Sequence, residues 1–212
     1  MDDFKTLSDA VIKGDIKTAV AETQQALDAG SNVNDILNKG LIATMDEVGE
    51  RFSKGLIFVP QMLRSAKAMQ ECTNLLKPYF QEGDVITKGK VLIGTVRGDL
   101  HDIGKNLISM MLESAGFTIS DLGVSVSPEK FVEKTKEVEP DIIGMSALLS
   151  TTMPAMPETI EALKKAGLRD KVKVIIGGAP VTKKYAREIM ADAYASDAGS
   201  AVTKAKNLLN IS

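Results

Sequence analysis

Residues 90–106 read KVLIGTVRGDLHDIGKN, a short apolar run followed by a polar loop. Similar runs recur along the rest of the chain, at Val91–Val96, Thr118–Leu122, Asp141–Ala147, Val172–Ile176 and, more weakly, Ala193–Ala195. Helical patterns lie between them, one of which begins at Ser127-Pro128-Glu129. Almost continuously apolar strands that alternate with helices are typical of a parallel sheet covered on both faces. Five such strands in about 120 residues predict a doubly wound, flavodoxin-like (Rossmann-like) α/β domain.

In the first part of the chain, the apolar residues have a different spacing from that of the strands. Apolar residues recur there every three or four positions, which predicts amphipathic helices. Gly14, followed by Asp15, and then Gly30 mark helix ends, and Pro60 suits a first helical position. Four helices with short connections predict a small bundle. We therefore expect a helical domain over residues 1–82, a linker over 83–90 and the α/β domain over 91–212.

Composition excludes several classes of function. The 212 residues carry 26 Lys and Arg against 28 Asp and Glu, so the chain lacks the basic excess of a nucleic-acid binder. With one cysteine, Cys72, and one histidine, His101, it can build neither an internal disulfide nor a Cys-rich or multi-His metal site. No apolar run reaches the length of a membrane span, and the acidic N-terminus is unlike a signal peptide. We expect a cytoplasmic protein without nucleic-acid or membrane partners.

The loops that follow the strands are the places to look for chemistry, because open parallel sheets bind ligands beyond the carboxyl ends of their strands. The first loop holds His101, two residues after Asp99. A neutral imidazole can coordinate a metal through one nitrogen while its other N–H donates to a carboxylate. One protein ligand cannot hold a free ion, but it can occupy an axial position of a metal held by a macrocycle. The alternative is a loop histidine that simply caps the next helix.

The same loop does not fit a phosphate-binding loop. Five residues separate Gly98 from Gly104, where that motif has four, and Asn106 stands where a magnesium-binding Ser or Thr belongs.

The pattern Asp-x-His-x-x-Gly at Asp99, His101 and Gly104 resembles the lower-ligand motif of methionine-synthase-type cobalamin-binding domains. That motif is followed in the family by Ser-x-Leu and then by Gly-Gly. Here 41 residues separate Gly104 from the first of these, and a further 28 precede the second. The residues that match are Ser146 and Leu148, and then Gly177 and Gly178.

The resemblance implies cobalamin bound with its nucleotide base detached from cobalt, and His101 as the axial ligand of the metal. Asp99 and a hydroxyl at Thr152, or alternatively at Thr151, would continue from the histidine as a catalytic triad. Ser146 would reach the buried base, and the two glycines would let the nucleotide tail pass close to the backbone. The other expected cofactor-binding residues are Asp102, Ile103, Gly104, Leu148, Tyr194 and Ala195.

Residues 52–62 resemble the core of the helical cap that covers the upper cobalt face in these methyltransferases. The positions that match its cobalt-facing apolar residues are Phe52, Val59 and Met62, although the family commonly has Leu at the position of Val59. The alternative is that all three belong to the ordinary core of the bundle.

The whole chain resembles the small corrinoid proteins of methanogens and acetogens. The resemblance implies a carrier, not catalytic alone, with methylcobalamin as its working form. It would pass a methyl group from a substrate:corrinoid methyltransferase to a second methyltransferase acting on a thiol or tetrahydrofolate. The donor is left open among methanol, methylamines, methoxylated aromatics and betaines. The alternatives are a cobalamin-sensing regulator, which usually adds a DNA-binding segment and often has a Trp in the cap, and an isomerase subunit, which generally lacks the cap.

Overall fold

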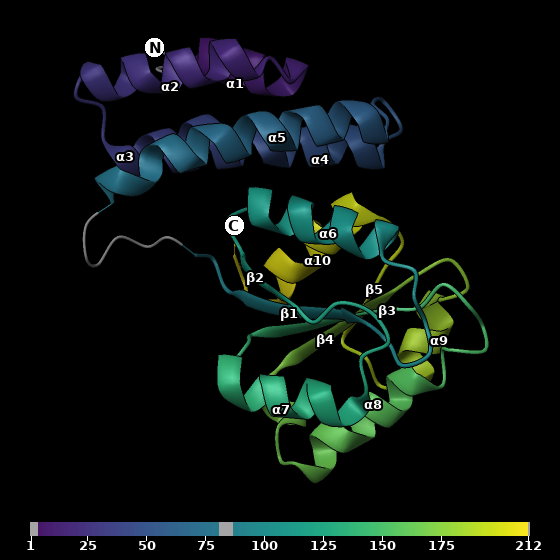
Figure 1. Ribbon diagram of the computed structural model, residues 1–212. Helices are drawn as coiled ribbons and strands as arrows, with labels where there is room; N and C mark the ends of the chain where they lie inside the picture. Colours follow the sequence, from purple (N-terminus) through teal and green to yellow (C-terminus); the bar gives the residue numbers. More distant parts are fainter. Residues whose placement is uncertain (1–3, 81–86, 212) are drawn as a thin grey trace. The chain divides into compact units, whose positions relative to one another are not determined.

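The computed structural model describes residues 4–80 and 87–211 (Figure 1). They fall into two compact units, one helical, formed by residues 4–80 with 114–116, and one α/β, formed by 87–113 and 117–211. Residues 83–86 of the expected linker lie outside the described residues, whereas its last residue, Lys90, is the first residue of a strand. The exact domain boundaries stay a prediction.

The helical unit contains the amphipathic helices that the sequence predicts. Its buried side chains come from the apolar positions of each helix and include Leu7, Val11, Met45, Val48 and Met69. Its elements are α1 (Lys5–Lys13), α2 (Ile16–Asp28), α3 (Val33–Asp35), the π-helical segment η1 (Ile36–Ile42), α4 (Ala43–Ser53), α5 (Val59–Leu76) and the short η2 (Lys77–Tyr79).

The junction of α1 and α2 explains why Gly14 and Asp15 stand there. Gly14 ends α1 with a left-handed φ of 69°, and a Cβ at this position would come within 2.5 Å of the Arg64 Cβ on α5. Asp15 caps α2 by accepting a hydrogen bond from the Thr18 backbone N–H. On α5, the Ser65 hydroxyl donates to the carbonyl of Ile12 over 3.0 Å. The glycine therefore both stops α1 and allows its end to approach α5 closely.

The segment η1 was not predicted, because Leu37, Leu41, Met45, Val48 and Phe52 recur at the spacing of an ordinary α-helix. A π turn includes one more residue than an α turn and frees backbone groups from their usual partners. The carbonyl of Gly40 accepts a hydrogen bond from the Thr44 hydroxyl over 2.7 Å. A Cβ on Gly40 would come within 3.0 Å of Leu7, so the glycine also lets η1 approach α1.

The α/β unit contains one parallel five-stranded sheet in the order β2-β1-β3-β4-β5, which confirms the predicted doubly wound fold. The register pairs Thr95 with Ser146 and Ser146 with Gly177, so the loops after β1, β3 and β4 leave the same edge of the sheet. The strands are β1 (Lys90–Thr95), β2 (Thr118–Asp121), β3 (Ile142–Ser146), β4 (Lys173–Gly177) and β5 (Ala193–Ala195).

Helices cover both faces of this sheet (Figure 1). On one face lie α6 (Ile103–Ser114) and α10 (Ala198–Leu208). The opposite side carries α7 (Pro128–Val138), α8 (Ala155–Lys165) and α9 (Lys183–Glu188), and the short η3 (Arg169–Lys171) precedes β4. The main apolar core joins α7, α8 and α9 to the sheet. Among the described residues, no helix has the length and apolar character needed to span a membrane.

Candidate functional site

Asp99 and His101 lie in the loop between β1 and α6, at the carboxyl edge of the sheet. The Asp99 carboxylate is fully buried, and its Oδ1 accepts a hydrogen bond from the His101 backbone N–H over 3.1 Å. The same oxygen lies 2.8 Å from His101 Nδ1. The other oxygen, Oδ2, accepts from the backbone N–H groups of Leu148 and Leu149, at 2.8 and 3.3 Å, and from the Thr152 hydroxyl at 2.7 Å. The Asp99 carboxylate is thus held through Oδ2 by the loop after β3 and through Oδ1 by His101.

These hydrogen bonds decide the charge of Asp99. Burial alone would raise its pKa, but the Thr152 hydroxyl, the His101 backbone and ring, and the Leu148 N–H together hold the pKa well below the ordinary value. An ionised carboxylate can only accept hydrogen bonds, so His101 donates through Nδ1–H. This fixes the tautomer and leaves the lone pair of Nε2 available on a ring whose side chain is 51% exposed.

The structure distinguishes the two candidate hydroxyls in the loop after β3. Thr152 is buried and contacts Asp99, whereas Thr151 is exposed to solvent. The arrangement His101–Asp99–Thr152 is therefore present as a hydrogen-bonded chain. Its catalytic role stays a prediction.

A third loop, between β2 and α7, braces the first one and was missed by the sequence analysis. The Gly98 N–H donates to the Ser125 hydroxyl over 3.0 Å, and the Ser125 N–H donates to the Asp99 carbonyl over 2.9 Å. Ser125 has a left-handed φ of 51°, unusual for a residue that is not glycine. No sequence motif marks this contact, because three of its four hydrogen-bonding groups belong to the backbone.

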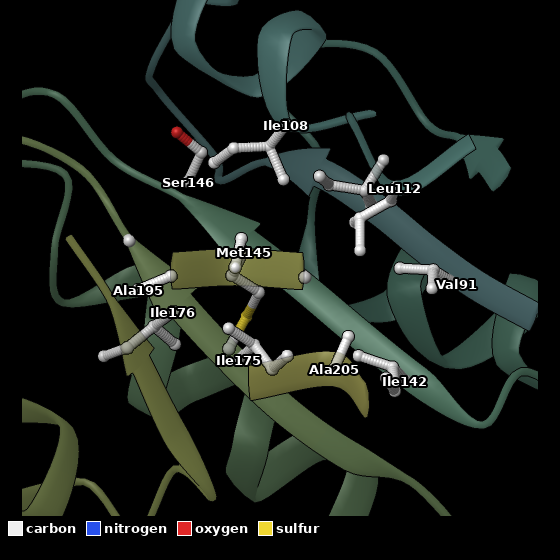
Figure 2. Close-up of a pocket in the computed structure, with 14 residues that line it drawn as sticks. Val91, Ile108, Leu112, Ile142, Met145, Ser146, Ile175, Ile176, Ala195 and Ala205 are labelled. Atoms are coloured by element: carbon white, nitrogen blue, oxygen red, sulfur yellow. The ribbon is translucent and has the colours of Figure 1, made fainter. Parts of the chain in front are cut away.

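A narrow apolar slot lies between the sheet and the helices α6 and α10 (Figure 2). Small residues on the strands and on α10 keep it open, and the Ser146 hydroxyl is among the few polar groups in its lining. The lining residues are Val91, Ile93, Ile108, Leu112, Ile142, Gly144, Met145, Ser146, Ile175, Ile176, Gly177, Ala195, Ala201 and Ala205.

Three of the expected cofactor-binding residues, Ser146, Gly177 and Ala195, line this slot. Tyr194 does not, because side chains alternate along a strand and its ring packs against the core on the opposite face. The expected roles of Tyr194 and Ala195 in cofactor binding both stay predictions.

Gly178 has a reason to be glycine that is independent of any ligand. Its φ is 130°, and a Cβ there would come within 1.9 Å of the Ala147 carbonyl oxygen. The ends of β3 and β4 approach each other closely at this point, and only glycine allows it.

The remaining expected residues of the first loop lie around His101. Asp102 accepts a hydrogen bond from the Asn106 side chain over 3.1 Å, Gly104 is exposed, and Ile103 is 86% exposed. Ile103 and Leu148 belong to a wider set of exposed apolar residues that follow β1 and β3. Its members are Leu100, Ile103, Leu148 and Leu149. Leu100 and Leu149 were missed, although apolar residues in loops at this edge are a signal that could have identified them.

The expected cap residues belong to the helical unit. Phe52 is partly buried and Val59 is partly exposed, while Met62 is fully buried within α5. The burial of Met62 agrees with the alternative interpretation of a bundle core residue. That any of the three faces cobalt stays a prediction.

The residues of the α/β unit fit a corrinoid. An imidazole with a fixed tautomer offers one nitrogen ligand, as an axial position requires. Exposed leucine and isoleucine side chains flank it, and they suit the largely apolar face of a macrocycle. The slot adds an apolar space with one hydroxyl in its lining, which suits a flat aromatic base with a polar edge.

Comparisons with known proteins agree with this fit. Residues 89–203 and residues 4–77 each match a family model described as a B12 binding domain. The dimethylamine corrinoid protein 1 of Methanosarcina acetivorans is 47% identical over 210 residues, which cover 97% of each chain.

Two solved structures resemble the chain over nearly its full length. A cobalamin-binding protein from Desulfitobacterium hafniense has a TM-score of 0.82 and 32% identity, covering 95% of this chain and 96% of that one. The methanol:cobalamin methyltransferase complex MtaBC from Methanosarcina barkeri has a TM-score of 0.87 and 28% identity, covering 98% and 80%. The chain therefore belongs to the B12-binding family and is a corrinoid protein whose cofactor is cobalamin.

Proposed function

We propose that this protein carries a methyl group between two methyltransferases, with cobalamin held base-off and with His101 as the lower axial ligand. Cobalamin, when bound, supplies the cobalt centre that takes up and releases the methyl group. A relative named for dimethylamine supports a methylamine as the donor, and the similarity to a methyltransferase complex supports a substrate-specific methyltransferase as the first partner. The second partner would transfer the group to a thiol or tetrahydrofolate, in the cytoplasm.

The single observation that carries this proposal is the hydrogen bond between His101 Nδ1 and the buried Asp99 carboxylate. This hydrogen bond orients the ring. It also makes Nε2 a stronger metal ligand, because the negative charge of Asp99 next to Nδ1 raises the basicity of Nε2. The Thr152 hydroxyl and the Leu148 N–H keep Asp99 ionised. The ring would therefore keep this tautomer whether or not Nε2 is bound to the metal.

The slot would hold the nucleotide base away from the metal. Gly144, Gly177 and Ala195 keep bulky side chains out of the sheet side of the slot, and Ser146 would offer a hydroxyl to a ring nitrogen. With the base in the slot, the histidine has no competitor for the lower position. The apolar loop residues Leu100, Ile103 and Leu149 would exclude water from that face.

The helical unit would cover the upper face through Phe52, Val59 and Met62, as a cap that protects the carried group from water. Because Met62 is buried in α5, Phe52 and Val59 are the two that could contact a ligand without repacking the bundle.

The function is tested by methyl transfer from a labelled donor. The protein is loaded with cobalamin, reduced, and mixed with a methylamine methyltransferase and isotope-labelled dimethylamine. The expected result is label recovered with the protein, in an amount that depends on both the enzyme and the loaded cofactor. Monomethylamine, trimethylamine and methanol with their own methyltransferases serve as donor controls. Failure to accept a methyl group from every donor, together with stable binding of adenosylcobalamin, would favour a regulator instead.

A further inference from the structure

Lys105 is a buried cation that the proposed function does not use. It is the third residue of α6, and its side chain is only 1% exposed. Its ammonium forms an ion pair with Oδ2 of Asp121, the last residue of β2, and donates to Asn106 Oδ1 over 2.7 Å. The other oxygen of Asp121 accepts from the Gly123 N–H over 2.8 Å. The pair therefore joins the first turn of α6 to the edge strand of the sheet.

This lysine is costly in two ways. Removing an ammonium from water carries a large desolvation penalty unless it is paired and hydrogen-bonded. A positive charge in the first turn of a helix is also opposed by the helix dipole. A cation at this place is therefore not explained by the stability of α6. We therefore look for its role in the residues that α6 holds in place.

The helix α6 serves two parts of the cofactor site. His101 lies two residues before the start of α6, and the Asn106 side chain in the first turn donates a hydrogen bond to Asp102, the residue after the histidine. Within the next two turns of the helix, Ile108 and Leu112 form a wall of the slot. The slot has a cavity volume of only about 30 Å³, so an aromatic base needs α6 or α10 to move away from the sheet. Without an anchor, movement of α6 would also displace the histidine.

We propose that Lys105 is a positioning residue that anchors the first turn of α6 to β2 through Asp121. The anchor keeps His101 Nε2 in a fixed place and direction, while the part of α6 that carries Ile108 and Leu112 adjusts to the base. The chain Asp121–Lys105–Asn106–Asp102 transmits the constraint from the sheet edge to the histidine loop. This inference rests on the proposed role of His101 as an axial ligand.

The test uses cobinamide, a corrinoid without the nucleotide and its base. It leaves the slot empty, so its affinity for the protein reports His101 and the loop surface alone. The full-length protein is compared with Lys105→Met and Asp121→Asn, and Lys105→Arg tests rescue by a retained charge. Lys134→Met is the matched control, because Lys134 forms an ion pair with Glu137 on α7, remote from this loop.

Lys105→Met and Asp121→Asn are expected to lower cobinamide affinity about tenfold, as for other residues that orient a metal ligand. They should also reduce the histidine nitrogen splitting in the electron paramagnetic resonance (EPR) spectrum of the Co(II) form. Lys105→Arg should recover part of both, and Lys134→Met should change neither. In a His101→Ala background, Lys105→Met should cause no further loss, since a residue acting through another is not additive with it.

Unchanged splitting and affinity in both variants would overturn the proposal, and so would a loss that is fully additive with His101→Ala. If Lys105→Met does not fold, Asp121→Asn decides, because Asp121 is 37% exposed and the substitution keeps the shape of its side chain. If the wild-type protein itself shows no histidine nitrogen on cobalt, the proposed function fails, and this inference with it.

Discussion

The two faces of the sheet in the α/β unit are built from the same strands but from different residues. On the face covered by α7, α8 and α9, large side chains such as Phe131, Met156 and Leu163 pack against the sheet and are fully buried. On the face covered by α6 and α10, glycines and alanines take many of the equivalent places, and a slot remains. Alternation along each strand lets the two faces carry side chains of different size.

This difference between the two faces indicates that one contributes mainly to the stability of the fold and the other to ligand binding. A close-packed face gains the free energy of burying apolar area, about 25 cal/mol per Å². A face with small residues gives up part of that gain and keeps room for a ligand. Substitutions on the first face should therefore change folding, and substitutions on the second should change cofactor affinity.

The largest effect is expected from truncation on the packed face. Phe131→Ala should lower the free energy of unfolding by about 3–5 kcal/mol, because it removes a fully buried ring and leaves a cavity. Urea denaturation of the apoprotein measures this loss. The cobalamin affinity of the folded fraction should stay that of the wild type. A strong loss of affinity in the folded protein would break the separation between the two faces.

The next effect concerns the site at the edge of the sheet. Asp99→Asn should weaken histidine ligation of cobalt by about 10–100-fold, because the charge that holds the Nδ1–H is lost. Titration of the Co(II) form with the protein, followed by visible absorption, measures it. Thr152→Val, which removes one donor to Asp99 and keeps the charge, is the milder control. Equal ligation in Asp99→Asn and the wild type would contradict the assigned tautomer.

The same substitution, alanine to leucine, can be made on each face of the sheet and tests the comparison between them. Ala201→Leu would fill the slot from α10, and it should reduce cobalamin affinity about tenfold or more, because it occupies the space that the base needs. Ala186→Leu, on α9 against the packed core, should instead destabilise the protein by about 1–3 kcal/mol through overpacking. Cobinamide should bind both variants like the wild type, since it does not enter the slot. Equal effects of the two substitutions on affinity would contradict the assignment of the slot.

The sequence predicts the sheet well and the details of the site less well. The apolar runs locate all five strands to within one or two residues, because burial on both faces leaves a continuous signal. The sequence pattern does not tell which of Tyr194 and Ala195 lines the slot, since a single step along a strand moves a side chain to the other face. The π-helical segment was missed because it preserves the apolar pattern that indicated an α-helix.

Contacts made through the backbone or over long distances in sequence could not be predicted. The N–H groups of Leu148 and Leu149 hold Asp99, but a backbone group has no sequence signature. The burial of Lys105 was equally hidden, because a lysine in a helix normally indicates an exposed position and Asp121 lies 16 residues away.

The last prediction concerns the pH dependence of apoprotein stability. The folded-state pKa of Asp99 is lowered, so its contribution is fully present above its unfolded pKa of about 3.9 and is lost as the pH falls through the folded value. The loss should approach about 1.4 kcal/mol per pH unit below pH 4. Denaturation from pH 6 to pH 2 should show a flatter acid limb in Asp99→Asn. Identical acid limbs would mean that Asp99 is not stabilised as a carboxylate.

The most direct test of the account is the EPR spectrum of the protein loaded with cob(II)alamin, recorded with ¹⁵N in the histidine and, separately, in the nucleotide base. A single axial nitrogen that changes its splitting with labelled histidine, and not with labelled base, is the predicted result. It would place His101 on cobalt and the base elsewhere, because this chain has one histidine. A splitting that responds only to the labelled base would contradict the account.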